Sequence, residues 1–284
     1  MKGLDSIRAR RTRVYRLVAL YFALTVLALI FLLPYYVIVR NALSNRAEIT
    51  GIKWTWLPAH PQWSNIASLF TSNSSMLHGL GNSALIAVVQ TIATLAIGAA
   101  AGYGLAKIPY RHRHLVFAAF LGTLMVPSAV TFVPTFVVVA KLGWVNTLVG
   151  IIMPGVFSVF TVFIFRQFFL DFPNELEEAG RIDGLGAWGV FTRIVMPNSV
   201  GVTIALGSIT FINSWNAFLW PLVVGQDQST WTVQVTVSSY LNAYHINLPA
   251  LFAGSLMSIL PLVLLFFVFQ RYIVQGVKMS GVKG

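Results

Sequence analysis

Residue types that perform acid–base, nucleophilic or metal chemistry are scarce in this sequence, and their spacing matches no catalytic site. The 284 residues include eight acids, five histidines and no cysteine. Without cysteine there is neither a disulfide nor a thiolate metal site. The sequence has no HExxH helix for zinc and no GxxxxGK[ST] loop for nucleotide phosphates. We therefore expect no metal, no bound cofactor and no catalytic residues, so the chain is not expected to be an enzyme.

Four residues near position 215 have the chemistry of carbohydrate binding. Sugars bind proteins through aromatic faces and amide hydrogen bonds, and Asn213, Trp215, Asn216 and Trp220 bring both types within eight residues. These four residues are a candidate substrate path. The alternative stays open, because Asn also packs helices together in membranes and Trp anchors them at the membrane interface.

The segments that must position these residues are very apolar. The chain is 57% hydrophobic and 10% charged, whereas soluble domains carry about 25% charged residues. Six segments without Asp, Glu, Lys or Arg are long enough for a transmembrane helix of roughly 20 residues. They are Leu17–Val39, Leu80–Ala106, Leu115–Ala140, Leu148–Phe165, Pro197–Val224 and Leu248–Phe269. The sequence therefore predicts an all-α membrane protein with six transmembrane helices. The first segment exceeds the ~7–15 residues of a signal-peptide core, so a retained anchor is favoured over a cleaved leader.

The Lys and Arg residues are distributed unequally between the two sides that these spans define. When sides alternate along the chain, one side carries 15 and the other carries 4. The positive-inside rule places the richer side in the cytoplasm. This predicts cytoplasmic N- and C-termini, with a basic N-terminus over residues 1–16, a membrane domain over 17–275 and a tail over 276–284. The net charge of +11 thus reflects topology, and no nucleic acid is expected as a partner.

Two loops between the spans stand out. The outer loop, residues 41–79, contains Trp54, Trp56 and Trp63. These are interpreted as an interfacial aromatic belt, with a docking surface for an external partner as the alternative. The inner loop, residues 171–197, holds five of the eight acids between positions 171 and 183. The spans themselves contain no ionisable residue, which argues against proton-coupled transport and favours a neutral solute.

The inner loop has the pattern of helix, glycine turn and helix. Asn174, with Glu177 three residues later, fits an N-cap with a capping box, and Gly184 fits the end of that helix. A second helix is expected over Leu185–Val195. Its apolar face would contain Leu185, Trp188, Phe191 and Val195. An acidic helix followed by an apolar face is explained by docking into a groove of another protein.

The same loop resembles a known motif. Glu178-Ala179-Gly180, Gly184, Ile194 and Met196-Pro197 match the spacing of the cytoplasmic EAA loop of ABC importer permeases: EAA, three residues, G, nine residues, I, one residue, LP. Gly180 replaces the third-place Ala, and Met196 replaces Leu. Met for Leu nearly conserves volume, whereas Gly in place of Ala is expected to loosen the first helix by up to about 1 kcal/mol.

Three further segments are similar to carbohydrate importer permeases of the MalG type. They are residues 165–169 (FRQFF), residues 210–222 (TFINSWNAFLWPL) and the end of the chain, residues 270–276 (QRYIVQG) and 281–284 (GVKG). The resemblance thus covers nearly the whole chain and implies a type I ABC importer permease fold in a bacterial or archaeal plasma membrane.

The resemblance also implies partners and site residues. A second, MalF-like permease would complete the pore, two ATPase subunits would bind ATP and Mg²⁺, and an extracytoplasmic solute-binding protein would deliver substrate. The loop would dock in a cleft of the ATPase, and its displacement would rock the fourth and fifth spans. The coupling role then falls on Glu178, Ala179, Gly180, Asp183, Gly184, Leu185, Trp188, Phe191, Ile194 and Pro197.

Other functions are weighed against a sugar importer. A permease for a polyol or a glycerophosphodiester has the same architecture, but a phosphate-bearing substrate predicts a basic pore residue, which the spans of this chain lack. A channel or membrane scaffold leaves the acidic and amphipathic loop unexplained. A membrane enzyme lacks a catalytic constellation.

Overall fold

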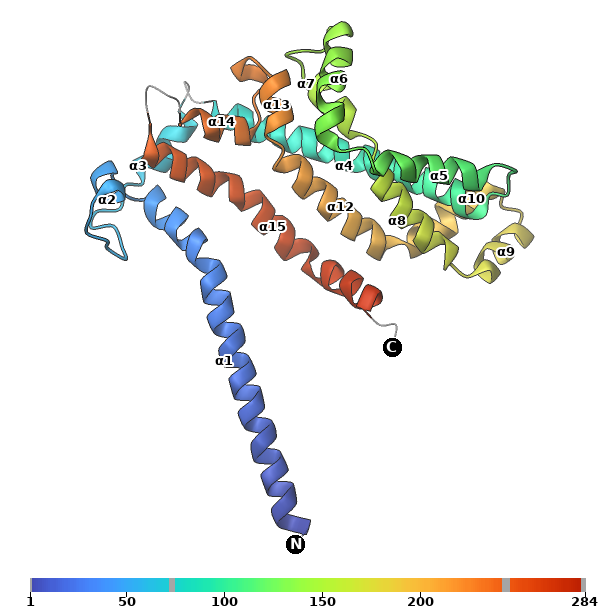
Figure 1. Cartoon of the computed structure of the whole chain (residues 1–284), viewed down its shortest axis with the longest axis horizontal. Helices are drawn as coiled ribbons and strands as arrows, with labels where there is room; N and C mark the ends of the chain where they lie inside the picture. Colours follow the sequence, from blue (N-terminus) through green and yellow to red (C-terminus); the bar gives the residue numbers. More distant parts are fainter. Residues whose placement is uncertain (1, 72–74, 242–245, 282–284) are drawn as a thin grey trace. The chain divides into compact units, whose positions relative to one another are not determined.

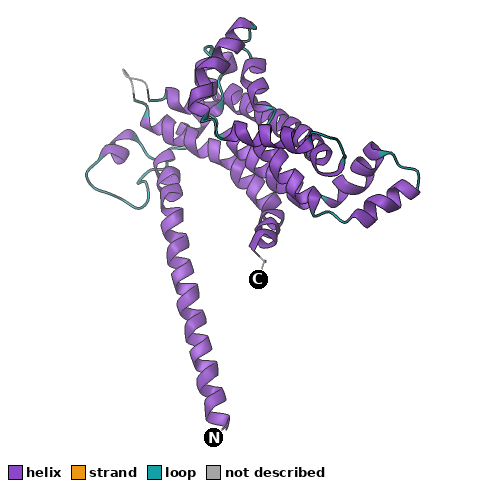
Figure 2. Ribbon diagram, turned by 45° about the vertical axis from the view of Figure 1, so that its right-hand side comes forward, coloured by secondary structure: helices purple, strands orange, loops and turns teal. Residues whose placement is uncertain are grey.

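The computed structural model describes residues 2–71, 75–241 and 246–281, with side chains described over 13–71, 75–241 and 246–270. Residues 282–284 of the expected tail and 72–74 of the outer loop lie outside the described residues. Within the described ranges the regular structure is helical (Figure 2), apart from one isolated antiparallel bridge between Leu241 and Ile246. The chain divides into two units, residues 1–71 with 240–257 and residues 72–239 with 258–284.

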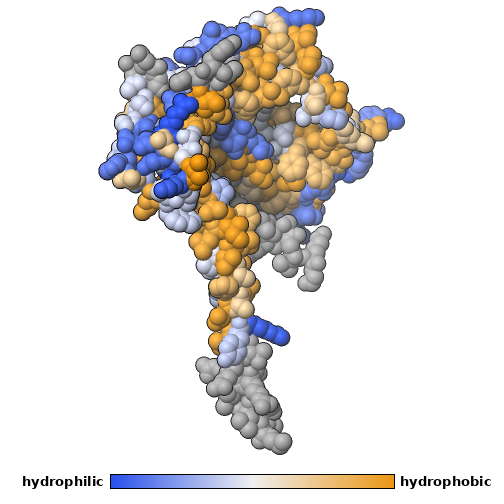
Figure 3. Space-filling model, turned by 60° about the vertical axis from the view of Figure 1, so that its left-hand side comes forward, coloured by the Kyte–Doolittle hydropathy of each residue, from blue (hydrophilic) through white to orange (hydrophobic). Residues whose placement is uncertain are grey.

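The first unit is built on one long helix, α1 (Lys2–Ala42), which continues the first predicted span into the basic N-terminus. Its apolar side chains are mostly exposed, for example Phe22 and Phe31, and hydrophobic residues cover most of the coloured part of this helix in Figure 3. Exposed apolar residues all around a helix are expected where lipid is the solvent. The unit also contains α2 (Arg46–Thr50), α3 (Ser64–Ala67), the 3₁₀ turn η1 (Ser68–Phe70) and the start of α15 (Leu248–Gly281).

The second unit is organised around α4 (Met76–Lys107), which packs along α8 (Val159–Leu170), α12 (Val200–Trp215) and α14 (Val233–Ser239) (Figure 1). The α4–α8 contact is close, because a Cβ on Gly102 would lie 2.7 Å from the Cβ of Phe165. The C-terminal half of α4 in this contact joins an apolar core that includes Tyr103, Phe169 and Phe191. Helix α4 is therefore the element on which α8, α12 and α14 pack.

Not every predicted span is a single helix. The third is two helices, α5 (Arg113–Leu124) and α6 (Ser128–Lys141), which meet at 98°. The break falls at Met125–Pro127, where Pro127 disfavours helical geometry in the preceding residue. The fourth span starts as α7 (Leu148–Ile152), passes through the 3₁₀ turn η2 (Met153–Gly155) and continues as α8.

The fifth predicted span, Pro197–Val224, is wrong as a single helix. Helix α11 (Met196–Asn198) is followed by α12, the helices on either side of this break make an angle of 78°, and α13 (Leu219–Val224) is separate. The 3₁₀ turn η4 (Gln228–Thr230) follows. By length and composition the described residues contain four helices able to cross a membrane, or up to six if each bent pair is one span. The prediction of an all-α membrane protein is confirmed, with two of its spans broken.

Candidate coupling loop and substrate cavity

The inner loop folds as helix, turn and helix, as the sequence predicts. Helix α9 (Asn174–Ile182) ends at a turn in which Gly184 has φ +85°. The Gly184 amide donates to the Arg181 carbonyl at 3.0 Å, and the Leu185 amide donates to the Gly180 carbonyl at 2.9 Å. These bonds satisfy carbonyls that the helix end leaves free. The chain continues through α10 (Ala187–Val190), the π-helical turn η3 (Phe191–Val195) and α11.

The predicted capping box at Asn174 and Glu177 is wrong. Asn174 is the first residue of α9, Pro173 takes the N-cap position, and no side chain caps the helix. Both side chains instead bind residues of α4, more than 60 positions earlier in the chain. Asn174 Oδ1 accepts a hydrogen bond from Lys107 Nζ at 2.7 Å, and Glu177 is only 3% exposed. The tertiary partners compete successfully for the groups that a local cap would use.

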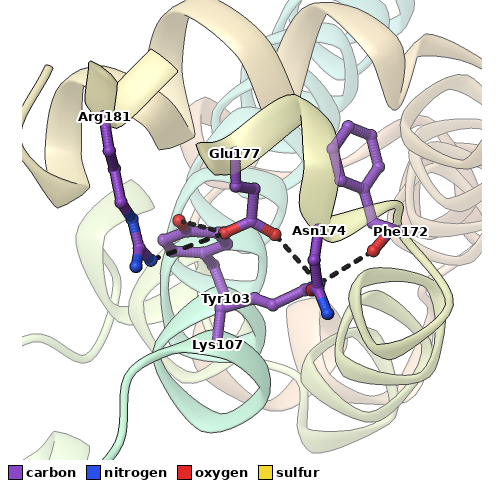
Figure 4. Close-up of polar contacts among 6 residues, drawn as sticks. All are labelled: Tyr103, Lys107, Phe172, Asn174, Glu177 and Arg181. Atoms are coloured by element: carbon purple, nitrogen blue, oxygen red, sulfur yellow. Dashed lines mark hydrogen bonds and ion pairs between the residues drawn. The ribbon is translucent and has the colours of Figure 1, made fainter. Parts of the chain in front are cut away.

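Glu177 is the centre of a polar cluster between α9 and α4 (Figure 4). Its Oε1 lies 2.9 Å from Lys107 Nζ, and its Oε2 accepts a hydrogen bond from the Tyr103 hydroxyl at 3.1 Å. Arg181, one turn later on α9, lies 3.9 Å from the same carboxylate but is largely exposed. Lys107 Nζ also donates to the Phe172 carbonyl at 2.8 Å. The sequence places Glu177 at the start of a helix and Lys107 among the basic residues that set the membrane topology. It does not predict that the two side chains meet.

The apolar face of the second helix faces mainly into this chain, which corrects the expectation that it is presented to a partner. Phe191 and Val195 are buried, and Leu185 packs on the same core. The Phe191 ring lies 5.0 Å from the Tyr103 ring, centroid to centroid. Of the four predicted residues only Trp188 is exposed, at 68%. The periodicity predicted the face correctly, but it could not say which surface would cover it.

The exposed side of the loop contains both predicted and unpredicted residues. Glu178, Ala179 and Asp183 are exposed beside Trp188, whereas Gly180 is buried and Ile194 half-buried. Ile182 is 86% exposed and was not singled out from the sequence. The signal in the sequence was an isoleucine at the end of an otherwise acidic and polar helix. The large apolar side chains that the described part of this loop leaves exposed are Trp188 and Ile182, with Leu176 less so at 45%.

Close packing explains why a glycine stands at position 180, and the sequence did not reveal this. A Cβ at this position would lie 2.3 Å from Cδ1 of Ile194 and 3.4 Å from Cγ2 of Val190. Gly180 therefore allows α9 to approach the π turn closely, rather than merely loosening its helix.

We expect Gly180→Ala to change stability by less than about 1 kcal/mol, because the gain in helix propensity is offset by displacement of the Ile194 side chain from its rotamer. In an Ile194→Val background, which lacks Cδ1, the same change should stabilise by up to about 1 kcal/mol. Thermal unfolding of the detergent-purified complex measures both. Equal effects of Gly180→Ala in the two backgrounds would contradict the packing explanation.

A cavity of about 370 Å³ lies between α4, α7, α12 and α13 in the second unit. It is lined by Gln90, Thr94, Ile151, Pro154, Gly155, Ser158, Thr210, Asn213, Ser214, Ala217 and Trp220. Gln90 donates to the carbonyls of Ile151 and Ile152 and accepts from Ser214 Oγ at 2.6 Å. No charged residue is among the described residues of this lining. The cavity therefore offers amide, hydroxyl and indole groups to a neutral polar molecule.

The four candidate substrate-path residues divide into two pairs. Asn213 and Trp220 line the cavity, and the Trp220 indole N–H donates to the Gly150 carbonyl at 3.2 Å. Trp215 and Asn216 are outside the lining. Trp215 is 2% exposed and donates to the Ser258 carbonyl at 3.0 Å, and Asn216 accepts from Gln234 at 3.3 Å. For Trp215 the structure favours helix packing, the alternative that the sequence left open.

Comparison with known proteins gives the family. Residues 94–279 match the family model of the binding-protein-dependent transport system inner membrane component. The arabinooligosaccharides transport system permease AraQ of Bacillus subtilis is 33% identical over 95% of this chain and 97% of its own length. The lactose transport system permease LacG of Rhizobium radiobacter is 35% identical over 90% and 93%. The sn-glycerol-3-phosphate permease UgpE of Yersinia enterocolitica is 32% identical over 87% and 91%.

Among solved structures, a chain of a bacterial ABC transporter involved in the import of the acidic polysaccharide alginate has the same fold. Its TM-score is 0.79 over 92% of this chain and 96% of that chain, at 21% sequence identity. The fold and the match to the family model agree. The chain belongs to the family of binding-protein-dependent transport system inner membrane components, and is a multi-pass permease subunit of a bacterial ABC importer that works with ATPase and binding-protein partners.

Proposed function

We propose that this permease forms half of the translocation pathway for a sugar or an oligosaccharide. The observation that carries the proposal is the cavity lined by Gln90, Asn213 and Trp220, with no charged side chain among its described lining residues. An aromatic face beside amide groups suits a carbohydrate. The relatives named for arabinooligosaccharides and lactose support the same substrate class.

A second candidate substrate is a phosphorylated polyol, because one relative is named for sn-glycerol 3-phosphate. A phosphate favours Arg or Lys in its site. The lining of this cavity contains neither among its described residues, so the partner permease would have to supply the positive charge. This makes the neutral sugar the better-supported substrate.

The proposed complex contains this chain, a distinct second permease, two ATPase subunits and an extracytoplasmic solute-binding protein. Residues 171–197 face the cytoplasm together with both termini, and residues 41–79 face outward. Glu178, Trp188 and Ile182 on the exposed side of the loop contact an ATPase, while the buried side connects the loop to the spans. ATP hydrolysis then belongs to the ATPase subunits.

The substrate class is tested on the whole complex. The native complex is purified with its partners, its subunits are identified by mass spectrometry, and the solute-binding protein is titrated with arabinooligosaccharides, lactose and sn-glycerol 3-phosphate. The ligand that binds is then followed into proteoliposomes that contain the complete complex and ATP. Uptake of a sugar supports the proposal, and uptake of sn-glycerol 3-phosphate alone would replace it with the second candidate.

The cavity is tested with a matched pair of asparagines. We expect Asn213→Ala to raise the KM for uptake about tenfold, the loss of one hydrogen bond of about 1.4 kcal/mol. Asn216→Ala removes the same side chain outside the lining and should change KM less than about twofold. Trp220→Ala should resemble Asn213→Ala, and Trp220→Phe should keep much of the stacking. Equal KM values for the two asparagine variants would remove Asn213 from the substrate path.

A further inference from the structure

Lys107 joins three separate points of the inner loop through one side chain. An ammonium group has three hydrogen-bond donors and no acceptor. Here Nζ lies 2.8 Å from the Phe172 carbonyl, 2.7 Å from Asn174 Oδ1 and 2.9 Å from Glu177 Oε1. Figure 4 shows these groups converging on Nζ from the turn before α9 and from α9 itself. The last residue of α4 thus holds the loop at its entry and along its first helix.

The ion pair at the centre of this cluster is largely buried, although Asn174 and Arg181 at its edge are exposed. Both the Lys107 and Glu177 side chains are almost inaccessible, and the Tyr103 ring that borders them packs on Phe169 and Phe191. A buried ion pair contributes little net stability, because desolvation offsets the attraction. Its better-attested role is to fix one relative position of the groups that it joins. That role here is to fix α9 against the end of α4.

Helix α4 leads from this cluster to the cavity without a break. Tyr103 and Lys107 lie at its cytoplasmic end, and Gln90 and Thr94, which line the cavity, lie on the same helix. Gln90 and Lys107 are about 25 Å apart along the axis at 1.5 Å per residue. The helix has no internal proline. The covalent route from the loop toward Asn213 instead passes through a π turn and the 78° bend before α12.

We propose that Lys107 is a positioning residue for coupling, and that α4 carries displacement of the loop directly to the cavity through Lys107 and Glu177. This inference rests on the proposed coupling function of residues 171–197 and adds a second route to the covalent one. When an ATPase subunit displaces α9, the cluster moves the end of α4 with it. Because α4 is one continuous helix from Gln90 to Lys107, we expect the cavity wall to move as well.

The test uses the complete complex in proteoliposomes, with uptake of the sugar that stimulates the wild type most among arabinooligosaccharides and lactose. Uptake per ATP hydrolysed is the readout. In the double variant Lys107→Met/Glu177→Gln neither charge is left buried without its partner, and Gln can still accept from Tyr103. We expect this variant to assemble, to hydrolyse ATP and to lose about tenfold in uptake per ATP, within the range of allosteric couplings.

The double variant also distinguishes two roles of the ion pair: holding α9 in position against α4, and only neutralising two buried charges. If the pair only neutralises two buried charges, removing both restores normal coupling, and an uptake per ATP within about twofold of wild type would overturn the proposal. Arg181→Ala is the matched control, because Arg181 contacts the same carboxylate at 3.9 Å but is 54% exposed. It should change coupling by less than about twofold.

A milder variant decides the matter if the double variant does not assemble. Asn174→Ala keeps the ion pair but removes one of the two hydrogen-bond acceptors of Lys107, and should lower uptake per ATP about threefold. Unchanged coupling in Asn174→Ala would then count against the proposal. A different result is expected if residues 171–197 are not the coupling loop at all. In that case a turn variant at Gly184 would also keep normal uptake per ATP. If the turn variant uncouples transport and the Lys107 variants do not, only the α4 route is wrong.

Discussion

Gly184→Val should uncouple ATP hydrolysis from transport. Gly184 has φ +85°, a conformation that a β-branched residue adopts only at a cost of about 1–3 kcal/mol. No neighbouring atom lies within 4 Å of a Cβ built at this position. The cost of the substitution is therefore in the backbone and not in a clash. To relieve it, the turn must change, and the hydrogen bonds from the Gly184 and Leu185 amides, which fix α9 against α10, would be lost.

A displaced turn changes how motion of the ATPase is passed through the loop to the spans. The exposed residues that contact the ATPase in our proposal, Glu178 and Trp188, lie on opposite sides of this turn. If their relative position is no longer fixed, motion of the ATPase is absorbed within the loop and does not reach the spans. We expect uptake per ATP to fall at least about tenfold, which corresponds to about 1.4 kcal/mol of coupling free energy.

The control for Gly184→Val lies two residues away. Gly186 has φ −71° and ψ 171°, which any residue adopts, and a Cβ there also meets nothing within 4 Å. Gly186→Val therefore adds the same side chain to the same loop without backbone strain and should leave coupling within about twofold. Gly184→Asn should retain part of the coupling, because Asn tolerates positive φ better than Val does. Full coupled uptake in Gly184→Val would reject the coupling assignment of residues 171–197.

The elements that depend on local sequence could be predicted, and those that depend on distant contacts could not. Apolar length predicted the membrane helices, and the glycine at position 184 predicted the turn. The 98° break at Met125–Pro127 was not predicted, because hydropathy stays high through it and carries no information on direction. Proline at position 127 was the local signal for that break.

The site shows the same division. Glu177 lies three residues after Asn174, a spacing that suits a capping box, yet its partners Tyr103 and Lys107 are 70 or more residues away. Spacing of three and four correctly grouped Phe191 with Val195 on one face, but period alone does not distinguish the chain's own core from a partner's groove. In this loop the core takes most of the face and leaves Trp188 exposed. Sequence patterns thus predicted the helix, turn and helix of residues 171–197 but not how this loop is joined to the spans.

Arg40→Ala should release the outer loop. Arg40 lies in the last turn of α1, and the sequence counts it as one of the four outer charges, but it is only 3% exposed. Its guanidinium donates to the Thr55 carbonyl at 3.2 Å, to Thr55 Oγ1 at 2.8 Å and to the Glu48 carbonyl at 3.2 Å. It also lies 4.7 Å from the centroid of the Trp54 ring. One side chain thus fixes residues 48–55 against the end of the first span.

The expected cost of Arg40→Ala follows from the groups that it leaves behind. Two backbone carbonyls, the Thr55 hydroxyl and Asn41 Oδ1, which accepts from Arg40 at 2.9 Å, lose a charged donor. Each such loss costs about 1–3 kcal/mol when the group stays buried. The loop can move to solvate some of these groups, so we expect local stability to fall by about 3 kcal/mol. Amide hydrogen exchange over residues 43–62 should then be more than about 100-fold faster, because local opening becomes that much more frequent. Exchange in α4 of the same protein should be unchanged.

Two variants separate the contribution of the several N–H donors of Arg40 from that of its positive charge. Arg40→Lys keeps the positive charge but cannot reach several acceptors in fixed directions, so exchange in the loop should be intermediate. Arg46→Ala removes an exposed arginine from the start of α2 and should leave exchange within about twofold of wild type. Wild-type exchange in Arg40→Ala would mean that the capping box of Asn45 with Glu48 and the Asn65 contacts to the Ala42 and Ser44 carbonyls hold the loop by themselves. Faster exchange would show instead that Arg40, which the sequence analysis counted only for topology, holds residues 43–62 of the outer loop in place.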